Sequence, residues 1–314
     1  MCKKDLPSGW LGQAFVFNSQ AGLSFGLVQD RGGPCGVMAA VQGSLLKVLL
    51  HGSQRFRVKA SSQQSLEAGL SLKQRTVALA AALAEVLVRC RGQEEELTVV
   101  MSGMRKHFTS AGRLRADGLT ETANIFHFSS AQELWEFLCN NSGFFIGHGN
   151  SAVVCFLYSC ILTRGVDNVR ADMDSRDSHL MAAHGYCSQE MVNLVTTGVA
   201  ASNVFDNKVV LGSDKDQTVL KGVEKQSEVG LLSLFEHYKS CSVGSHLKSP
   251  VYPIWLVCSE SHFTTLWASD NTKELCYYDG LSGNNHSQVL NIFNSSGRSG
   301  ESHPPEPGHR GGPA

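Results

Sequence analysis

The chain has 314 residues, a formal net charge of −1 and a hydrophobic share of 42%. This length suits one large domain or two modest ones, and the apolar share is enough for a sizeable core. The near-neutral charge provides no basic footprint for nucleic acid, and no apolar run reaches the roughly 20 residues that a membrane-spanning helix needs. We therefore expect neither nucleic acid nor a membrane as partner.

Short strands and long helices are predicted in the first half of the chain. Strands are expected at residues 14–17 and 24–28, and apolar residues at helical spacing predict a buried helix from Cys35 to about His51. The polar residues 53–72 are typical of a surface loop. The remaining segments are a helix at 72–90, strands at 97–101 and 123–128, and helices at 131–138 and 151–162.

The second half is predicted to be richer in strands. Residues 178–200 predict a helix in two pieces broken at Gly185, and residues 228–238 an amphipathic helix. Strands are expected at 208–211 and 218–220, followed by a three-stranded antiparallel meander at 252–258, 262–267 and 274–278. Residues 294–314 are dominated by Ser, Gly, Pro and His and should be disordered. We expect one α+β domain over residues 1–293 followed by this tail.

Ten cysteines are scattered along the chain, and the first residues lead into no apolar signal segment. We expect free thiols in a reducing compartment, the cytoplasm and also the nucleus. A structural metal site is an alternative role for some of these residues, because His179, His184 and Cys187 lie close together in the sequence. The two histidines are five residues apart, which points them to different faces of a helix, and no Cys-x-x-Cys pair is present. We expect no metal and no cofactor.

A turn built from Gly32, Gly33 and Pro34 leads directly into Cys35. Glycine reaches positive φ without strain and proline suits a first helical turn, so Cys35 is predicted to begin a helix. The positive end of the helix dipole and unpaired N–H donors favour the nucleophilic thiolate there. Gln29 would bring an amide N–H to the oxyanion formed when Cys35 attacks a carbonyl. A buried structural cysteine is the alternative.

A cysteine nucleophile that works near neutral pH needs a histidine as base. His262 stands out among twelve histidines because it opens a predicted strand beside a second apolar strand. Asp279, at the end of the next predicted strand, would reach across the hairpin and orient the imidazole of His262. The alternatives are an ordinary strand histidine and an aspartate that forms a turn before Gly280.

Six segments, in the same order along the chain, contain long stretches of sequence that are shared with one enzyme family. They are residues 28–43, 178–194, 201–205, 230–238, 253–263 and 277–281. The first contains Gln29 and Cys35 within the run VQDRGGPCGVMAAVQG. Together the segments resemble the MINDY deubiquitinases, in the branch of their third and fourth members, with the fourth-member group most similar. The resemblance covers roughly residues 8–285.

The resemblance implies a papain-like cysteine protease fold, with a helix carrying the nucleophile packed against an antiparallel sheet carrying the histidine. It implies hydrolysis of isopeptide bonds, with ubiquitin and lysine-48-linked polyubiquitin chains as partners. Cys35 matches the nucleophile, His262 the base and acid, and Gln29 the oxyanion-hole glutamine. A non-catalytic ubiquitin-binding family member is the alternative, and a papain-like acyl- or amine-transferring enzyme outside ubiquitin biology is a third hypothesis.

Overall fold

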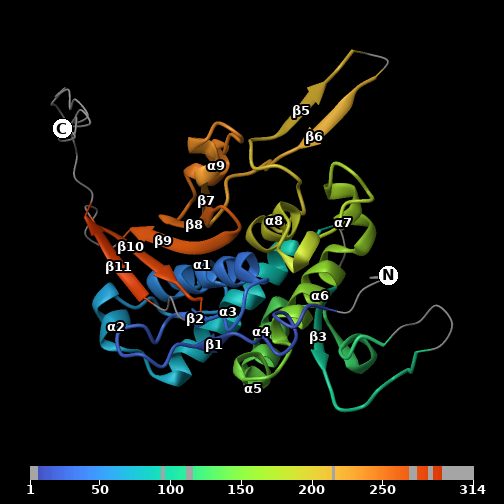
Figure 1. Ribbon diagram of the computed structural model, residues 1–314. Helices are drawn as coiled ribbons and strands as arrows, with labels where there is room; N and C mark the ends of the chain where they lie inside the picture. The colour runs from blue at the N-terminus through green and yellow to red at the C-terminus, as the bar shows by residue number, and fades with distance from the viewer. Residues whose placement is uncertain are drawn as a thin grey trace, which may run out of the picture.

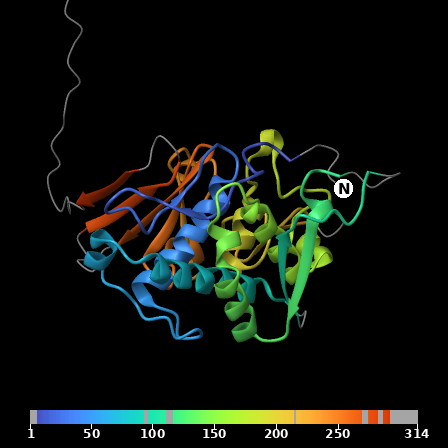
Figure 2. The ribbon, with the colours of Figure 1, turned by 90° about the horizontal axis from the view of Figure 1, so that it is seen from below.

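A helical layer and a five-stranded sheet meet along one central helix (Figures 1 and 2). The computed structural model describes residues 6–92, 96–110, 116–213, 216–268, 274–281 and 286–291. The α+β class is therefore confirmed. Residues 294–314, predicted to form a disordered tail, lie outside the described residues.

The helices include both long helices predicted from the sequence, with the predicted bounds. They are α1 (Cys35–His51), α2 (Gln63–Ala68), α3 (Leu72–Cys90), α4 (Ala131–Asn140), α5 (Ser142–Ile146), α6 (Ala152–Arg164), α7 (Val166–Asp172), α8 (Gln189–Thr197), α9 (Leu234–His237) and α10 (Ser245–Lys248), with 3₁₀ turns at Thr120–Thr122 and Ala183–Gly185. No single described helix is long and apolar enough to cross a membrane; α6 and α7 reach that length only as a pair bent by 86°.

The central helix is α1, which is buried on all sides from Cys35 to Leu49. A helix that is apolar around its whole circumference belongs in a core, and α1 packs against α3, α8, β8 and β9. Its few polar side chains tie it to its neighbours. Gln42 Oε1 accepts the backbone N–H of Leu27 at 2.7 Å, and Lys47 Nζ pairs with Glu85 of α3 at 2.8 Å. The position of Cys35 is thus set by the core itself.

Within the described ranges, the strands form one large sheet and three two-stranded pairs. They are β1 (Val16–Phe17), β2 (Leu27–Val28), β3 (Leu97–Ser102), β4 (Ala123–Phe128), β5 (Lys208–Leu211), β6 (Thr218–Lys221), β7 (Gly230–Ser233), β8 (Ile254–Ser259), β9 (His262–Ala268), β10 (Glu274–Asp279) and β11 (His286–Asn291). The large sheet has the order β11-β10-β9-β8-β7. The predicted meander of β8, β9 and β10 is confirmed, and the β5–β6 hairpin projects from the body (Figure 1).

The prediction of a helix at residues 228–238 is wrong for most of this segment. Gly230–Ser233 forms β7, which pairs in parallel with β8, and only the four residues of α9 are helical. A Cβ on Gly230 would lie 2.2 Å from the carbonyl oxygen of Leu247 and 2.6 Å from the Trp255 ring. The glycine therefore marks a close approach between segments, and the pairing with β8 overrides the helical periodicity.

Two further predictions need correction. The expected loop at 53–72 contains α2, which is held by a Ser62 N-cap and by Leu66, a fully buried side chain. The first piece of the helix expected at 178–200 is not helical apart from a 3₁₀ turn at Ala183–Gly185, in which His184 and Gly185 have φ of 61° and 81°. Two successive residues with positive φ end any right-handed helix, and the chain becomes helical again at α8.

Candidate active site

The turn before α1 places Cys35 at the helix start, as predicted. Gly33 has φ of 131°, a conformation that favours glycine, and Pro34 is the N-cap residue. Trp10 Nε1 donates to the carbonyl oxygen of Gly185 at 2.6 Å and covers the turn, since a Cβ on Gly33 would lie 2.9 Å from that nitrogen. Cys35 is 5% exposed.

Cys35 lies against the tight connection between β8 and β9. Its Sγ donates to the carbonyl oxygen of Ser261 at 3.5 Å. The next residue is His262, the first residue of β9 and the register partner of Ser259 in β8. The histidine is thus delivered to Cys35 by the end of a strand whose remaining residues are fixed in the sheet.

His262 lies between an acid and the thiol. Its Nε2 is 3.0 Å from Oδ1 of Asp279, the last residue of β10, whose side chain is 7% exposed. The hydrogen bond to Asp279, followed by a hydrogen bond to Cys35, raises the pKa of His262 to about 10, against the opposing effect of burial. Since Asp279 occupies Nε2, Nδ1 is left for Cys35. His262 is therefore an imidazolium at neutral pH.

Gln29 reaches the same place from the segment before the turn. Its backbone N–H donates to the carbonyl oxygen of Gly280 at 2.8 Å, directly after Asp279. Its side chain is buried, and one amide N–H of Nε2 donates to the carbonyl oxygen of Arg31. A cavity of about 20 Å³ is lined by Gln29, Cys35, His262 and Asp279 together. The structure thus brings together all four residues that were predicted from the sequence.

Two other cysteines lie close to Cys35 and were not expected there. Burial and the neighbouring charge of Cys35 raise the pKa of Cys187 to about 12 and that of Cys258 to about 11. Cys187 donates to the carbonyl oxygen of Gly33 at 3.4 Å. Both thiols therefore stay protonated at neutral pH and are weak nucleophiles. Within the described parts of the chain, no group of three or more His, Cys, Asp or Glu side chains is placed to hold a metal ion.

The site contains the groups that nucleophilic acyl transfer requires. A thiol lies beside an imidazole, the imidazole is oriented by a carboxylate, and a side-chain amide lines the same cavity. The cavity has about the volume that one water-sized group fills. Sequence reasoning missed Gly280 and Ser261, whose backbone carbonyls contact Gln29 and Cys35. The Asp-Gly pair at the end of the predicted β10 segment was the available signal for Gly280.

Comparisons with known proteins identify the family. The chain is 44% identical over 284 residues to the mouse protein named probable ubiquitin carboxyl-terminal hydrolase MINDY-4, covering 87% of this chain and 37% of the relative. The human MINDY-4 is 41% identical over 294 residues, covering 90% and 38%. Human ubiquitin carboxyl-terminal hydrolase MINDY-3 is 32% identical over 276 residues, covering 82% and 60%.

The chain therefore spans less than two fifths of the length of these MINDY-4 relatives. No solved structure matches it significantly. The family model described as "Deubiquitinating enzyme MINDY-3/4, conserved domain" matches residues 1–307. The chain belongs to the MINDY-3/4 family.

Proposed function

We propose that this chain is a cysteine isopeptidase that hydrolyses ubiquitin chains, with a preference for lysine-48 linkages and a papain-like arrangement of its active site. One observation carries the proposal: His262 is hydrogen-bonded to Asp279 and lines the same cavity as Cys35 at the junction of α1 with the sheet. The names of the relatives, ubiquitin carboxyl-terminal hydrolases, support ubiquitin as the substrate.

In the first half of the reaction, Cys35 Sγ attacks the carbonyl carbon of ubiquitin's terminal glycine, which is joined to a lysine of the next ubiquitin. The His262 imidazolium stabilises the thiolate before the attack. A C–S bond forms and the carbonyl oxygen becomes an oxyanion. His262 then donates its proton to the lysine nitrogen, the C–N bond breaks, and a thioester with Cys35 remains.

In the second half, neutral His262 takes a proton from water, and the hydroxide attacks the thioester carbonyl. The C–S bond breaks, which restores the thiolate and the imidazolium and leaves ubiquitin with a terminal carboxylic acid. This acid loses its proton to solvent and becomes the carboxylate. Asp279 keeps the imidazole oriented through both steps and stabilises its positive charge.

Donors for the oxyanion come from Gln29 and the start of α1. The backbone N–H groups of Gly36 and Val37 contact the Cys187 sulfur. Among the described residues, the N–H of Cys35 has no acceptor. Together with the second amide N–H of Gln29, it would stabilise the oxyanion.

The proposal is tested with ubiquitin that carries an electrophile at its C-terminus. We expect a covalent adduct that disappears in Cys35→Ala and persists in Cys258→Ala, a matched control that removes a neighbouring thiol. Cleavage of lysine-48-linked tetraubiquitin should exceed cleavage of lysine-63-linked tetraubiquitin. A folded protein that binds ubiquitin chains without ever forming the adduct would contradict the proposal and favour the non-catalytic alternative.

A further inference from the structure

A second and much larger cavity lies at the opposite end of α1 from Cys35. Its volume is about 1280 Å³, and Lys47 and His51 of the last turns of α1 form part of its wall. At 1.5 Å per residue, Lys47 is about 18 Å along the helix from Cys35. Residues of α3, of the ends of α6 and α7, and of the bases of β5 and β6 also line the cavity. The cavity is therefore separate from the site described above, and it has room for an entire small molecule.

The wall of this cavity carries an excess of positive charge. Among the residues that the structure describes, it contains eight lysines and arginines and four aspartates and glutamates, in a chain whose formal net charge is −1. Each of the four carboxylates already pairs with one basic side chain of the wall. These pairs are Lys47–Glu85 at 2.8 Å, Arg89–Glu228 at 2.6 Å, Arg164–Asp172 at 2.7 Å and Lys208–Glu224 at 2.8 Å. Four of the eight basic residues are thus outside these four ion pairs.

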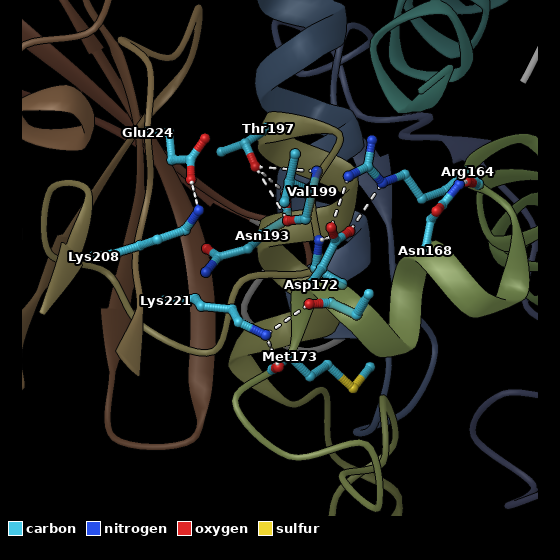
Figure 3. Close-up of polar contacts among 12 residues, drawn as sticks. Arg164, Asn168, Asp172, Met173, Asn193, Thr197, Val199, Lys208, Lys221 and Glu224 are labelled. Carbon is cyan, nitrogen blue, oxygen red and sulfur yellow. Dashed lines mark hydrogen bonds and ion pairs between the residues drawn. The ribbon is translucent and has the colours of Figure 1, made fainter. Parts of the chain in front are cut away.

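Lys221 is the best placed of these remaining cations. Figure 3 shows its side chain extending from the hairpin toward α7, where Nζ donates to the carbonyl oxygens of Ala171 and Met173 at 2.7 Å each. No carboxylate among the described residues forms an ion pair with this ammonium. Neutral carbonyls hold Lys221 in position without cancelling its charge, and one of its three N–H donors remains available.

Two more cations, Arg55 and Lys225, lie on the same wall. Both side chains are exposed, and neither forms an ion pair within the described part of the chain. They come from the segment after α1 and from the segment after β6, so they approach the cavity from different directions. A ligand with several separated negative charges would contact both of them and Lys221.

Two residues of the wall also carry polar atoms without a hydrogen-bond partner. The Ser227 hydroxyl and Arg89 Nε are buried and have no hydrogen-bond partner among the described residues. Both residues line the cavity, and Ser227 is only 5% exposed. Buried polar groups nearly always have a partner in folded proteins. Each of these atoms has less than 1 Å² of accessible surface, so a ligand in the cavity would reach them only after a local rearrangement of the wall.

We propose that this cavity binds a small molecule carrying several phosphate groups, such as an inositol polyphosphate or a nucleoside triphosphate. Lysine and arginine are the usual partners of phosphate oxygens, because each N–H forms a charge-assisted hydrogen bond. Several phosphates on one compact framework would match cations that come from separate segments. The site is independent of the proposed isopeptidase activity.

The test is isothermal titration calorimetry of the 314-residue chain with inositol hexakisphosphate, ATP and inorganic phosphate. We expect one of the first two to bind at a 1:1 ratio, more tightly than inorganic phosphate. In Arg55→Ala/Lys225→Ala, whose side chains are exposed and form no ion pair within the described part of the chain, the affinity should fall at least about tenfold. Binding of only one of the two probes would identify the source of the phosphates.

The matched control is Lys73→Ala, which removes another exposed lysine outside the cavity. Its affinity should equal that of the unchanged chain. Equal losses in Lys73→Ala and in the double variant would mean non-specific attraction and would overturn the proposal. So would the absence of binding by both polyphosphates at physiological salt.

Discussion

The backbone N–H of Gln29 donates to the carbonyl oxygen of Gly280 at 2.8 Å, and Gln29 forms a parallel bridge with Leu281. Next to it, the Tyr278 hydroxyl donates to the carbonyl oxygen of Leu27 at 3.2 Å. These contacts between residues 27–29 and 278–281, here called the seam, join the segment before Cys35 to the end of β10. The seam therefore fixes the nucleophile helix relative to Asp279 and its partner His262.

Substitution of Gly280 by alanine should open the seam. An added Cβ would lie 2.2 Å from the carbonyl oxygen of Leu27, a backbone atom that cannot rotate away. Forcing such a contact should lower the free energy of unfolding by about 1–3 kcal/mol and slow the reaction of Cys35 with a ubiquitin electrophile. Urea denaturation and the rate of adduct formation measure the two effects. Gly143→Ala is the control, because its added Cβ would meet nothing within 4 Å; equal behaviour of the two variants would show that the seam tolerates the side chain.

The pH dependence of activity should depend on Asp279. Its hydrogen bond is the largest cause of the rise of the His262 pKa to about 10. In Asp279→Asn the carboxylate charge is absent, so the pKa of His262 should fall toward its ordinary value. The alkaline limit of adduct formation should then move to lower pH, which a pH profile of the rate measures. Glu260→Gln, which removes an exposed charge two residues from His262, should leave the profile in place. An unchanged profile in Asp279→Asn would contradict the assigned role.

The same histidine should make the stability of the fold depend on pH. The pKa of His262 is about 10 in the folded chain, above the ordinary value of 6.5 that applies when the chain unfolds. Its stabilising contribution is therefore complete below pH 6.5 and is lost as the pH rises through about 10. The difference in unfolding free energy between the unchanged chain and His262→Gln should shrink over this interval. Urea titrations across the interval measure it, and a constant difference would mean that the pKa is not raised.

Gln29 offers a test that separates chemistry from structure. Its seam contact uses the backbone N–H, which any substitution except proline preserves. Loss of an oxyanion-hole donor typically costs about 10²–10³ in turnover. We expect that loss in the kcat of both Gln29→Ala and Gln29→Met, with little change in ubiquitin-chain affinity. If Gln29→Met, which restores most of the volume, recovers the rate, then the side chain acts by packing and not through its amide.

Local signals explain why the four residues of the candidate site could be expected to lie together. The glycine turn before Cys35 and Gly52 after the helix fix both ends of α1. Apolar alternation defines β8 to β10, and Asp279 ends β10. Because these elements are each defined locally, their junction could be expected once the cysteine and the histidine were chosen.

What could not be predicted depends on contacts between distant segments. The segment of β7 has helical periodicity and becomes a strand only because β8 pairs with it. The second cavity has no local signal, since its cations come from separate helices, strands and loops, and each appears in the sequence as an ordinary surface charge. The position of Cys187 beside Cys35 depends on the turn formed by His184 and Gly185.

The ion pair between Lys47 and Glu85 should contribute strongly to stability while both partners are present. The side chain of Lys47 is 7% exposed and that of Glu85 is 11% exposed. Glu85 also accepts a hydrogen bond from the Ser53 hydroxyl at 2.6 Å. Lys47→Ala leaves a nearly buried carboxylate without its cation, which should cost about 3–5 kcal/mol. Lys47→Met/Glu85→Leu removes both charges at similar volume and should recover most of that loss, because the cost comes from the isolated charge. Chemical denaturation of the single and double variants measures both values. A loss below about 1 kcal/mol in the single variant would indicate that water reaches Glu85, as it does in exposed pairs.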